Sequence, residues 1–286
     1  MKPSISVVIP VYNGEETLAD CLRALEAQSL PGTSYELIVV DDGSSDDGAS
    51  IAERVDSRLL RQEELRESAA RKAGTRAAQG EWVAFTDADA VPTRTWLASL
   101  LAAVDGSKAN QAVLGAAGPI FGYASQTPAA RFADLTRGLD TEGHLKHPVF
   151  PYAPLGNVIY RRDALIRVGG PDERYRHYPG PDLHDRLLKD HGGEFHYVPR
   201  AVVLHHHRAT WRAFWRQQYG YGVGFDGDGN VFLAGYFSSV INLGGSNLVS
   251  AGGADIFLAR FDSFLNHVVS KRFGDTSNQY PLDLVV

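Results

Sequence analysis

The sequence lacks several features, and each absence excludes a class of protein. Cys21 is the only cysteine among 286 residues, so no intrachain disulfide can form, which agrees with a reducing compartment. A net charge of −6 gives no basic field for a nucleic-acid partner. No apolar run approaches the roughly 18 to 20 residues of a membrane span, and Met1 leads into a predicted strand without a signal peptide. We expect a cytoplasmic protein, with peripheral contact to the inner face of the membrane left open.

Two common nucleotide-binding patterns are also absent. No Gly-x-Gly-x-x-Gly follows the first predicted strand, and the sequence contains no Gly-Lys-Ser/Thr loop. These absences argue against dinucleotide and P-loop sites. What the chain does have is a 44% hydrophobic content, which over this length allows one large domain and a small one.

Strands and helices alternate in the N-terminal part of the chain. Apolar segments at 5–10, 35–40 and 82–85 predict buried strands, and apolar residues at helical spacing predict helices over 15–28 and 66–79. This alternation favours a parallel, doubly wound α/β sheet with a ligand crevice at the carboxyl ends of its strands.

Two carboxylates follow the third of these strands. Asp87 and Asp89 are two residues apart, so in an extended segment both side chains point the same way and can meet on one divalent cation. Such a cation would hold a diphosphate. Taken alone the pattern is weak, because acidic turns after strands are usually solvated caps.

Four motifs, in this order, resemble the family-2 glycosyltransferases of GT-A fold. They are Ser6-Val-Val-Ile-Pro10-Val-Tyr12-Asn13-Gly14, Val39-Val-Asp41-Asp42-Gly43-Ser44, Ala70-Arg71-Lys72-Ala73-Gly74 and Asp87-Ala-Asp89. The resemblance implies a GT-A doubly wound, mostly parallel nucleotide-sugar-binding sheet. It also implies an inverting, hexosyltransferase-type enzyme that uses Mn²⁺ or Mg²⁺ and a nucleotide sugar, with a UDP-sugar favoured. The acceptor would be a glycan, lipid-linked or small-molecule hydroxyl, as in cell-wall or polysaccharide biosynthesis.

The same resemblance assigns roles on the donor side of the site. It makes Asp89 the principal metal ligand. The donor-binding residues that it implies are Pro10, Tyr12, Glu15, Asp42, Arg71 and Asp87. Lys72 departs from the family pattern, which commonly has asparagine there; it would either add a cation near the diphosphate or face solvent.

The block from Pro154 to Leu188 resembles the acceptor-side half of the family. Asp182 matches the general base that deprotonates the acceptor hydroxyl, a step that inversion requires because a sugar hydroxyl is a poor nucleophile. Pro181 stands where members usually have glutamate, and proline suits a first helical turn. The alternative is that Asp182 only stabilises the start of a helix. Asp185 is the fallback base.

Three histidines end a predicted strand that follows this block. Strand alternation places His205 and His207 on one face and His206 on the other. In the resembling family a histidine near this position approaches the metal or diphosphate, which makes His205 the first choice and His207 the second. A three-histidine zinc site is disfavoured, because adjacent strand residues cannot all face one tetrahedral ion. A solvated strand end is the alternative, for His206 in particular.

The composition changes at about Asp226. Repeated glycines there punctuate short β-rich runs, which predicts a boundary between a transferase domain at 1–225 and a β-rich tail at 226–286. Segments of this tail resemble one unit of a bacterial β-propeller repeat. A propeller needs about four to eight blades, and one blade cannot bury both faces of its sheet by itself.

Two other functions are compatible with these patterns. Pro181, Lys72 and the foreign tail also fit a catalytically impaired nucleotide-sugar-binding or scaffold protein whose β-repeat is an interaction module. A nucleotidyltransferase would share the sheet and the acidic metal site. It is disfavoured, since the chain lacks the glycine-rich, basic start that binds a triphosphate.

Overall fold

The chain forms two compact units. The first unit comprises residues 1–174 and 178–210, and the second comprises residues 175–177 and 211–286. The computed structural model describes residues 3–31, 34–63, 65–105, 113–135, 140–146, 151–175, 179–214, 223–225, 231–237, 239–262 and 266–277.

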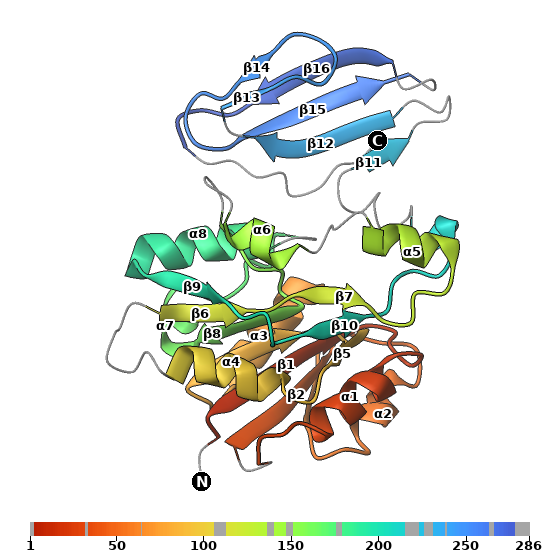
Figure 1. Ribbon diagram of the computed structural model, residues 1–286, viewed down its shortest axis with the longest axis vertical. Helices are drawn as coiled ribbons and strands as arrows, with labels where there is room; N and C mark the ends of the chain where they lie inside the picture. The colour runs from red at the N-terminus through yellow and green to blue at the C-terminus, as the bar shows by residue number, and fades with distance from the viewer. Residues whose placement is uncertain are drawn as a thin grey trace. The chain divides into compact units, whose positions relative to one another are not determined.

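A mostly parallel sheet forms the centre of the first unit (Figure 1). In spatial order its strands are β3 (Arg58–Arg61), β2 (Tyr35–Asp41), β1 (Ile5–Val11), β4 (Trp82–Thr86), β8 (Asn157–Arg161), β6 (Val113–Ala117) and β9 (Glu194–Tyr197). The first four strands are mutually parallel, β8 runs antiparallel to both β4 and β6, and β9 is parallel to β6. The carboxyl ends of β1, β2 and β4 therefore meet at one edge of the sheet, where α/β folds bind ligands.

Helices cover both faces of this sheet because the central strands are apolar on both sides. The helices are α1 (Leu18–Glu26), α2 (Gly48–Ala52) and α4 (Trp96–Asp105) on one face and α3 (Glu67–Ala77), α7 (Arg162–Arg167) and α8 (Gly180–His191) on the other. In β1, Val7 packs in the core cluster that contains Leu22 of α1, whereas Val8 packs in the cluster that contains Ala70 of α3. This alternation is the two-residue period of a strand.

A small second sheet lies within the first unit. Its strands are β5 (Ala90–Pro92), β10 (Val203–His205) and β7 (Ile120–Gly122), with β10 in the middle, antiparallel to β5 and parallel to β7. Because β5 begins directly after the Asp87–Asp89 turn, the pairing brings the histidine segment beside that turn. Two further helices are α5 (Pro128–Leu135) and α6 (Thr141–Leu145).

Asn157 joins the two sheets. Its side chain is fully buried. Its Nδ2 donates to the backbone carbonyls of Pro119 and Ala201 at 2.9 and 2.8 Å, and its Oδ1 accepts from Trp96 Nε1 at 2.7 Å. A buried amide that makes these three bonds positions the chain next to β7 and β10 against the carboxyl end of β4.

The predicted N-terminal elements are confirmed, with shifted ends. The strands predicted at 5–10, 35–40 and 82–85 each continue one residue further. The helix predicted at 15–28 spans only Leu18–Glu26, because the residues before it form a loop in which Asn13 has a left-handed backbone, with φ of 50°. The strand predicted before the three histidines is β10, which ends at His205.

The second unit is β-rich, as expected. Its sheet contains β11 (Val223–Phe225), β12 (Val231–Phe237), β15 (Asp255–Phe261) and β16 (His267–Phe273), all antiparallel, and β13 (Val240–Ile241) pairs with β14 (Leu248–Val249). Phe237, Phe257 and Ala259 form its small buried cluster.

The propeller resemblance of this tail is not confirmed. Among the described residues of the second unit the main sheet has four strands, and no propeller is detected. The compact units divide at Trp211, while residues 215–222 and 226–230 lie outside the described residues, so the boundary at 226 stays a prediction. Within the described residues, no helix has the length and apolar character needed to cross a membrane.

Candidate donor and metal site

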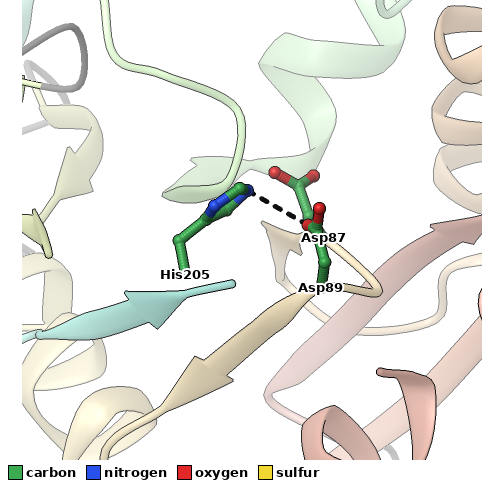
Figure 2. Close-up of side chains that lie close together, drawn as sticks. All are labelled: Asp87, Asp89 and His205. Carbon is green, nitrogen blue, oxygen red and sulfur yellow. Dashed lines mark ion pairs between the residues drawn. The ribbon is translucent and has the colours of Figure 1, made fainter. Parts of the chain in front are cut away.

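The structure brings Asp87, Asp89 and His205 together. One ligand atom from each residue lies within 4.8 Å of the others, and His205 Nε2 is 3.1 Å from Asp89 Oδ1. Figure 2 shows the imidazole facing the two carboxylates from the end of β10. The two acids come from the turn between β4 and β5, so residues far apart in the sequence form one cluster.

Backbone contacts hold this cluster in place. The turn closes through the Ala90 N–H, which donates to the Asp87 carbonyl at 3.1 Å. The His206 N–H donates to the Asp89 carbonyl at 2.8 Å. The pairing of His205 with Ala90 continues the same ladder. The side-chain directions of Asp89 and His205 are therefore consequences of strand pairing.

Arg71 of α3 is a buried partner of the dyad. Its side chain is 1% exposed and forms ion pairs with Asp87 and with Glu67, one helical turn earlier. Its guanidinium also lies over the ring of Phe85, 5.9 Å from the centroid. Arg71 contacts Asp87 in this arrangement, so a direct contact between Arg71 and the nucleotide stays a prediction.

The two carboxylates of the dyad differ in their electrostatics. Burial raises the pKa of Asp87 to about 6, although Arg71 opposes the shift. Burial would also raise the pKa of Asp89, but attraction and a hydrogen bond from His205 outweigh it and lower that pKa to about 2. In turn Asp89 raises the pKa of His205 against the effect of burial. Neighbouring groups with opposite shifts are typical of functional sites.

The cluster has the chemistry of a divalent-cation site. Carboxylate oxygens and an imidazole nitrogen are ligands that Mn²⁺ accepts, and carboxylates suit Mg²⁺. The ring nitrogen of His205 that faces the dyad is Nε2, 3.1 Å from Asp89 Oδ1. The donor atoms of Asp87, Asp89 and His205 therefore fit the metal that the sequence motifs imply.

The three histidines do not form a zinc site in this arrangement. His206 Nε2 lies 3.4 Å from Asp20 of α1, and His207 Nε2 lies 3.0 Å from Asp134 of α5. Among the described residues, His205 is the histidine that joins the acidic dyad. His207, the second choice from the sequence, lies nearby but outside the cluster.

Two loops that carry donor-site candidates are joined to each other. The Asn13 N–H donates to Ser44 Oγ at 2.9 Å, and the Glu15 N–H donates to Asp46 Oδ2 at 2.8 Å. The carboxylate of Glu15 in turn accepts from the backbone of Asp47 at 3.2 Å. Glu15 therefore holds the loops after β1 and β2 together, and its contact with a donor stays a prediction.

The other base-site candidates have different surroundings. Pro10 is buried within β1, whereas Tyr12, just after that strand, is half exposed. Asp42 is buried, and its carboxylate accepts hydrogen bonds from the backbone N–H groups of Leu65 and Arg66 at 2.9 and 2.8 Å. Asp42 thus fixes the loop before α3, and its role in holding the nucleotide base stays a prediction.

Asp182 lies in the first turn of α8, after Pro181. Its Oδ2 accepts from Arg186 Nε at 2.9 Å and from Arg186 Nη2 at 2.6 Å. Arg186 also donates to the Val168 carbonyl at 2.6 Å. The fallback residue, Asp185, forms an ion pair with Lys189 at 2.7 Å. Both candidate bases therefore have cationic partners on their own helix.

Lys72 forms an ion pair that the sequence did not indicate. Its Nζ lies 2.8 Å from a carboxylate oxygen of Glu173, and its side chain is 23% exposed. Lys72 therefore has an acidic partner in the protein, and its contribution of charge near the diphosphate stays a prediction. It joins α3 to the segment after α7.

Sequence reasoning missed several residues near the site, among them Arg208, whose Nη2 lies 3.6 Å from Asp89 Oδ2. Glu67 pairs with Arg71, Asp134 pairs with His207, and Gly156 leaves space for the dyad, because a Cβ there would lie 2.6 Å from Asp87 Oδ2. Glu67 had a usable signal, since it precedes Arg71 by four residues on a predicted helix. Asp134 and Gly156 had none, because their contacts arise only from tertiary packing.

Sequence comparisons relate this chain to known proteins. Residues 6–169 match the sequence profile described as Glycosyl transferase family 2. Glycosyltransferase AglE of Haloferax volcanii is 31% identical over 207 residues, which cover 70% of this chain and 62% of that protein. Pre-mycofactocin glycosyltransferase of Mycobacterium tuberculosis is 35% identical over 230 residues, which cover 76% of this chain and 46% of that protein.

A solved structure supports the fold. It is the mannosyltransferase PcManGT from Pyrobaculum calidifontis in complex with GDP-Man and Mn²⁺. The TM-score is 0.53 at 23% identity, with 76% of this chain and 60% of that chain covered. The first unit therefore has a GT-A-like α/β fold with a mostly parallel central sheet. The chain spans about half to three fifths of the length of the two curated relatives. Over the matched region, which carries the acidic dyad, the chain belongs to glycosyl transferase family 2.

Proposed function

We propose that this protein transfers a sugar from a nucleotide-sugar donor to an acceptor hydroxyl, with inversion and with a divalent cation. The observation that carries the proposal is the convergence of Asp87, Asp89 and His205 within 4.8 Å at the carboxyl end of β4. Family membership supports sugar transfer from a donor, and the proposal adds the metal, the stereochemistry and the residues. A UDP-sugar is the favoured donor and Mn²⁺ or Mg²⁺ the cation.

The residues of the site would divide the work as follows. A cation held by the dyad and His205 would neutralise the charge that develops on the departing nucleoside diphosphate. Asp89, with its lowered pKa, supplies an ionised ligand. Arg71 holds Asp87 from the buried side. Tyr12 and Asp42 would hold the base of the donor from the neighbouring strand ends.

Asp182 would accept the proton of the acceptor hydroxyl. The hydroxyl oxygen then forms a bond to the anomeric carbon from the face opposite the nucleotide, and the bond from that carbon to the diphosphate breaks. Among the described residues, both Arg186 donors reach Asp182 Oδ2, so Oδ1 would take the proton. The acceptor would be a glycan, lipid-linked or small-molecule hydroxyl.

The experiment that tests this proposal is calorimetric titration of UDP, GDP and TDP in Mn²⁺ and again in EDTA. We expect one nucleotide to bind only with Mn²⁺, and Asp89→Ala to weaken that binding by roughly 100-fold or more, since loss of an outer partner alone typically costs 10- to 100-fold in metal affinity. Asp163→Ala is the matched control, because Asp163 is an exposed acid in α7, just after the end of β8 that lies away from the dyad. Metal-dependent binding that survives in Asp89→Ala would contradict the proposal.

A second candidate function is a nucleotide-sugar-binding or scaffold protein without catalysis. The ion pair between Asp182 and Arg186 favours it, because that arginine competes with a substrate proton for the carboxylate. In this case the β-rich tail would be an interaction module. Donor binding without transfer or hydrolysis, with a radiolabelled nucleotide sugar and a range of acceptors, would support this candidate over the first.

A further inference from the structure

Each of three consecutive histidines at the end of β10 faces a different aspartate. His205 faces Asp89 at 3.1 Å. The other two pairs are His206 with Asp20 at 3.4 Å and His207 with Asp134 at 3.0 Å. The three aspartates come from the turn after β4, from α1 and from α5. The sequence motifs and the proposed metal site use only the first of these pairs.

The backbone fixes where His205 lies but not how its ring is turned. His205 is paired with Ala90 of β5 on one side and with Gly122 of β7 on the other. Its carbonyl accepts from the Tyr123 N–H at 2.8 Å. These bonds determine the position of the Cα atom. Rotation of the imidazole about its side-chain torsions needs a separate restraint.

The usual restraint is missing at His205. A histidine that binds a metal normally donates its other ring nitrogen to a carboxylate or carbonyl, and this outer partner fixes the ring. Nδ1 of His205 is buried and has no such partner among the described residues. The neighbour on the same strand face is His207, whose ring centroid lies 5.4 Å away with the planes tilted by 45°. His207 is therefore placed to hold the ring of His205.

Asp134 in turn holds His207, and Gly122 of β7 leaves the space that the Asp134 carboxylate occupies. Its carboxylate sits directly against β7, because a Cβ on Gly122 would lie 2.2 Å from Asp134 Oδ1 and 2.3 Å from Oδ2. Gly122 is also the register partner of His205. The carboxylate, the glycine and the two histidines thus form one packed unit beside the dyad.

We propose that His207 and Asp134 are positioning residues that fix the imidazole of His205 for metal binding. The inference rests on the proposed metal site. Asp134 orients His207 through the 3.0 Å contact, and His207 orients His205 by packing against its ring. His206 and Asp20 form the same kind of pair on the other face of the strand and have no part in this support.

The experiment is titration of the full chain with Mn²⁺ alone, followed by pulsed electron paramagnetic resonance for the ¹⁴N coupling that reports imidazole ligation. We expect Asp134→Asn and His207→Asn each to weaken Mn²⁺ binding by about 10- to 100-fold and to reduce the ¹⁴N coupling. The double variant should bind Mn²⁺ about as tightly as the single variant with the lower affinity, because Asp134 acts through His207 and the two losses do not add. Gly122→Ala should give the same loss by displacing the Asp134 carboxylate.

Asp20→Asn is the matched control. It removes one carboxylate charge next to the same strand, and we expect the Mn²⁺ affinity to stay within about 3-fold of the wild type, as for a pair without coupling to the site. If Asp134→Asn keeps both the affinity and the ¹⁴N coupling while His205→Ala loses the coupling, the positioning role is wrong and the metal site stands. If the wild-type chain binds no Mn²⁺, both proposals are overturned.

Discussion

The turn after β4 carries the two acids proposed to hold the cation, and the first turn of α8 carries the acid proposed as the base. The two regions differ in what holds these acids. Asp87 and Asp89 are held by residues distant in sequence, Arg71 and His205. Asp182 is held by Arg186, one turn further along its own helix. A short-range pair of this kind forms on many helices regardless of function. Convergence of distant segments is therefore stronger support for a site than a local ion pair is.

The largest expected effect is on the rate of sugar transfer, and it concerns Asp182. If it is the base, Asp182→Asn should lower the rate of transfer by about 10²- to 10⁴-fold, the typical contribution of general-base catalysis. Donor binding in the titration described above should be unchanged. The measurement is the initial rate with saturating nucleotide sugar.

Asp185→Asn provides the matched control for that variant, since Asp185 lies on the same helix and also pairs with a cation. A large loss in Asp185→Asn with a normal rate in Asp182→Asn would transfer the base role to the fallback residue. Equal and small losses in both would support the non-catalytic candidate.

The next effect concerns the buried side of the dyad. Arg71→Met should lower the free energy of unfolding by about 3 kcal/mol, because it leaves the Asp87 carboxylate without its buried cation. Glu67→Gln removes the charge of the other partner of Arg71. Because Glu67 is half exposed, this change should lower the free energy of unfolding by less than about 1 kcal/mol. Urea unfolding at pH 7.5 measures both. Equal losses would mean that Arg71 stabilises α3 and not the dyad.

The last effect concerns the packing around His184 of α8. His184 is fully buried between the rings of Tyr160 and Phe195, and burial lowers its pKa to about 3. In the unfolded chain the His184 imidazole binds a proton near pH 6.5, whereas in the folded protein it stays neutral down to about pH 3. The contribution of His184 to stability is therefore complete above pH 6.5 and is lost as the pH falls towards 3.

Replacement of this histidine should therefore flatten the pH dependence. We expect His184→Phe to show a smaller decrease in the free energy of unfolding between pH 6.5 and 4 than the wild type, measured by urea unfolding at several pH values. His196→Gln, at a partly exposed histidine of β9, should keep the wild-type slope. An unchanged slope in His184→Phe would contradict the buried, neutral state of His184.

The sequence by itself determined the central strands, the helices between them and the acidic dyad. Strand segments such as 35–40 are apolar on both faces, and only a sheet covered on both sides buries such residues. The directions of Asp87 and Asp89 follow from the strand that precedes them. Alternation along a strand also separates His205 and His207 from His206 without knowledge of the fold. The choice of His205 as the metal-site histidine came from the family resemblance.

Only the tertiary structure decided which side chains contact the dyad and which pair with other parts of the chain. Arg71 is turned to Asp87, Asp42 to the loop before α3, and Lys72 to Glu173. Asp134 reaches His207 because Gly122 leaves space for its carboxylate. These contacts join segments with no fixed spacing in sequence. The local pattern of residues can thus specify a strand and the face on which its side chains lie, whereas the partner of each side chain depends on how separate segments pack.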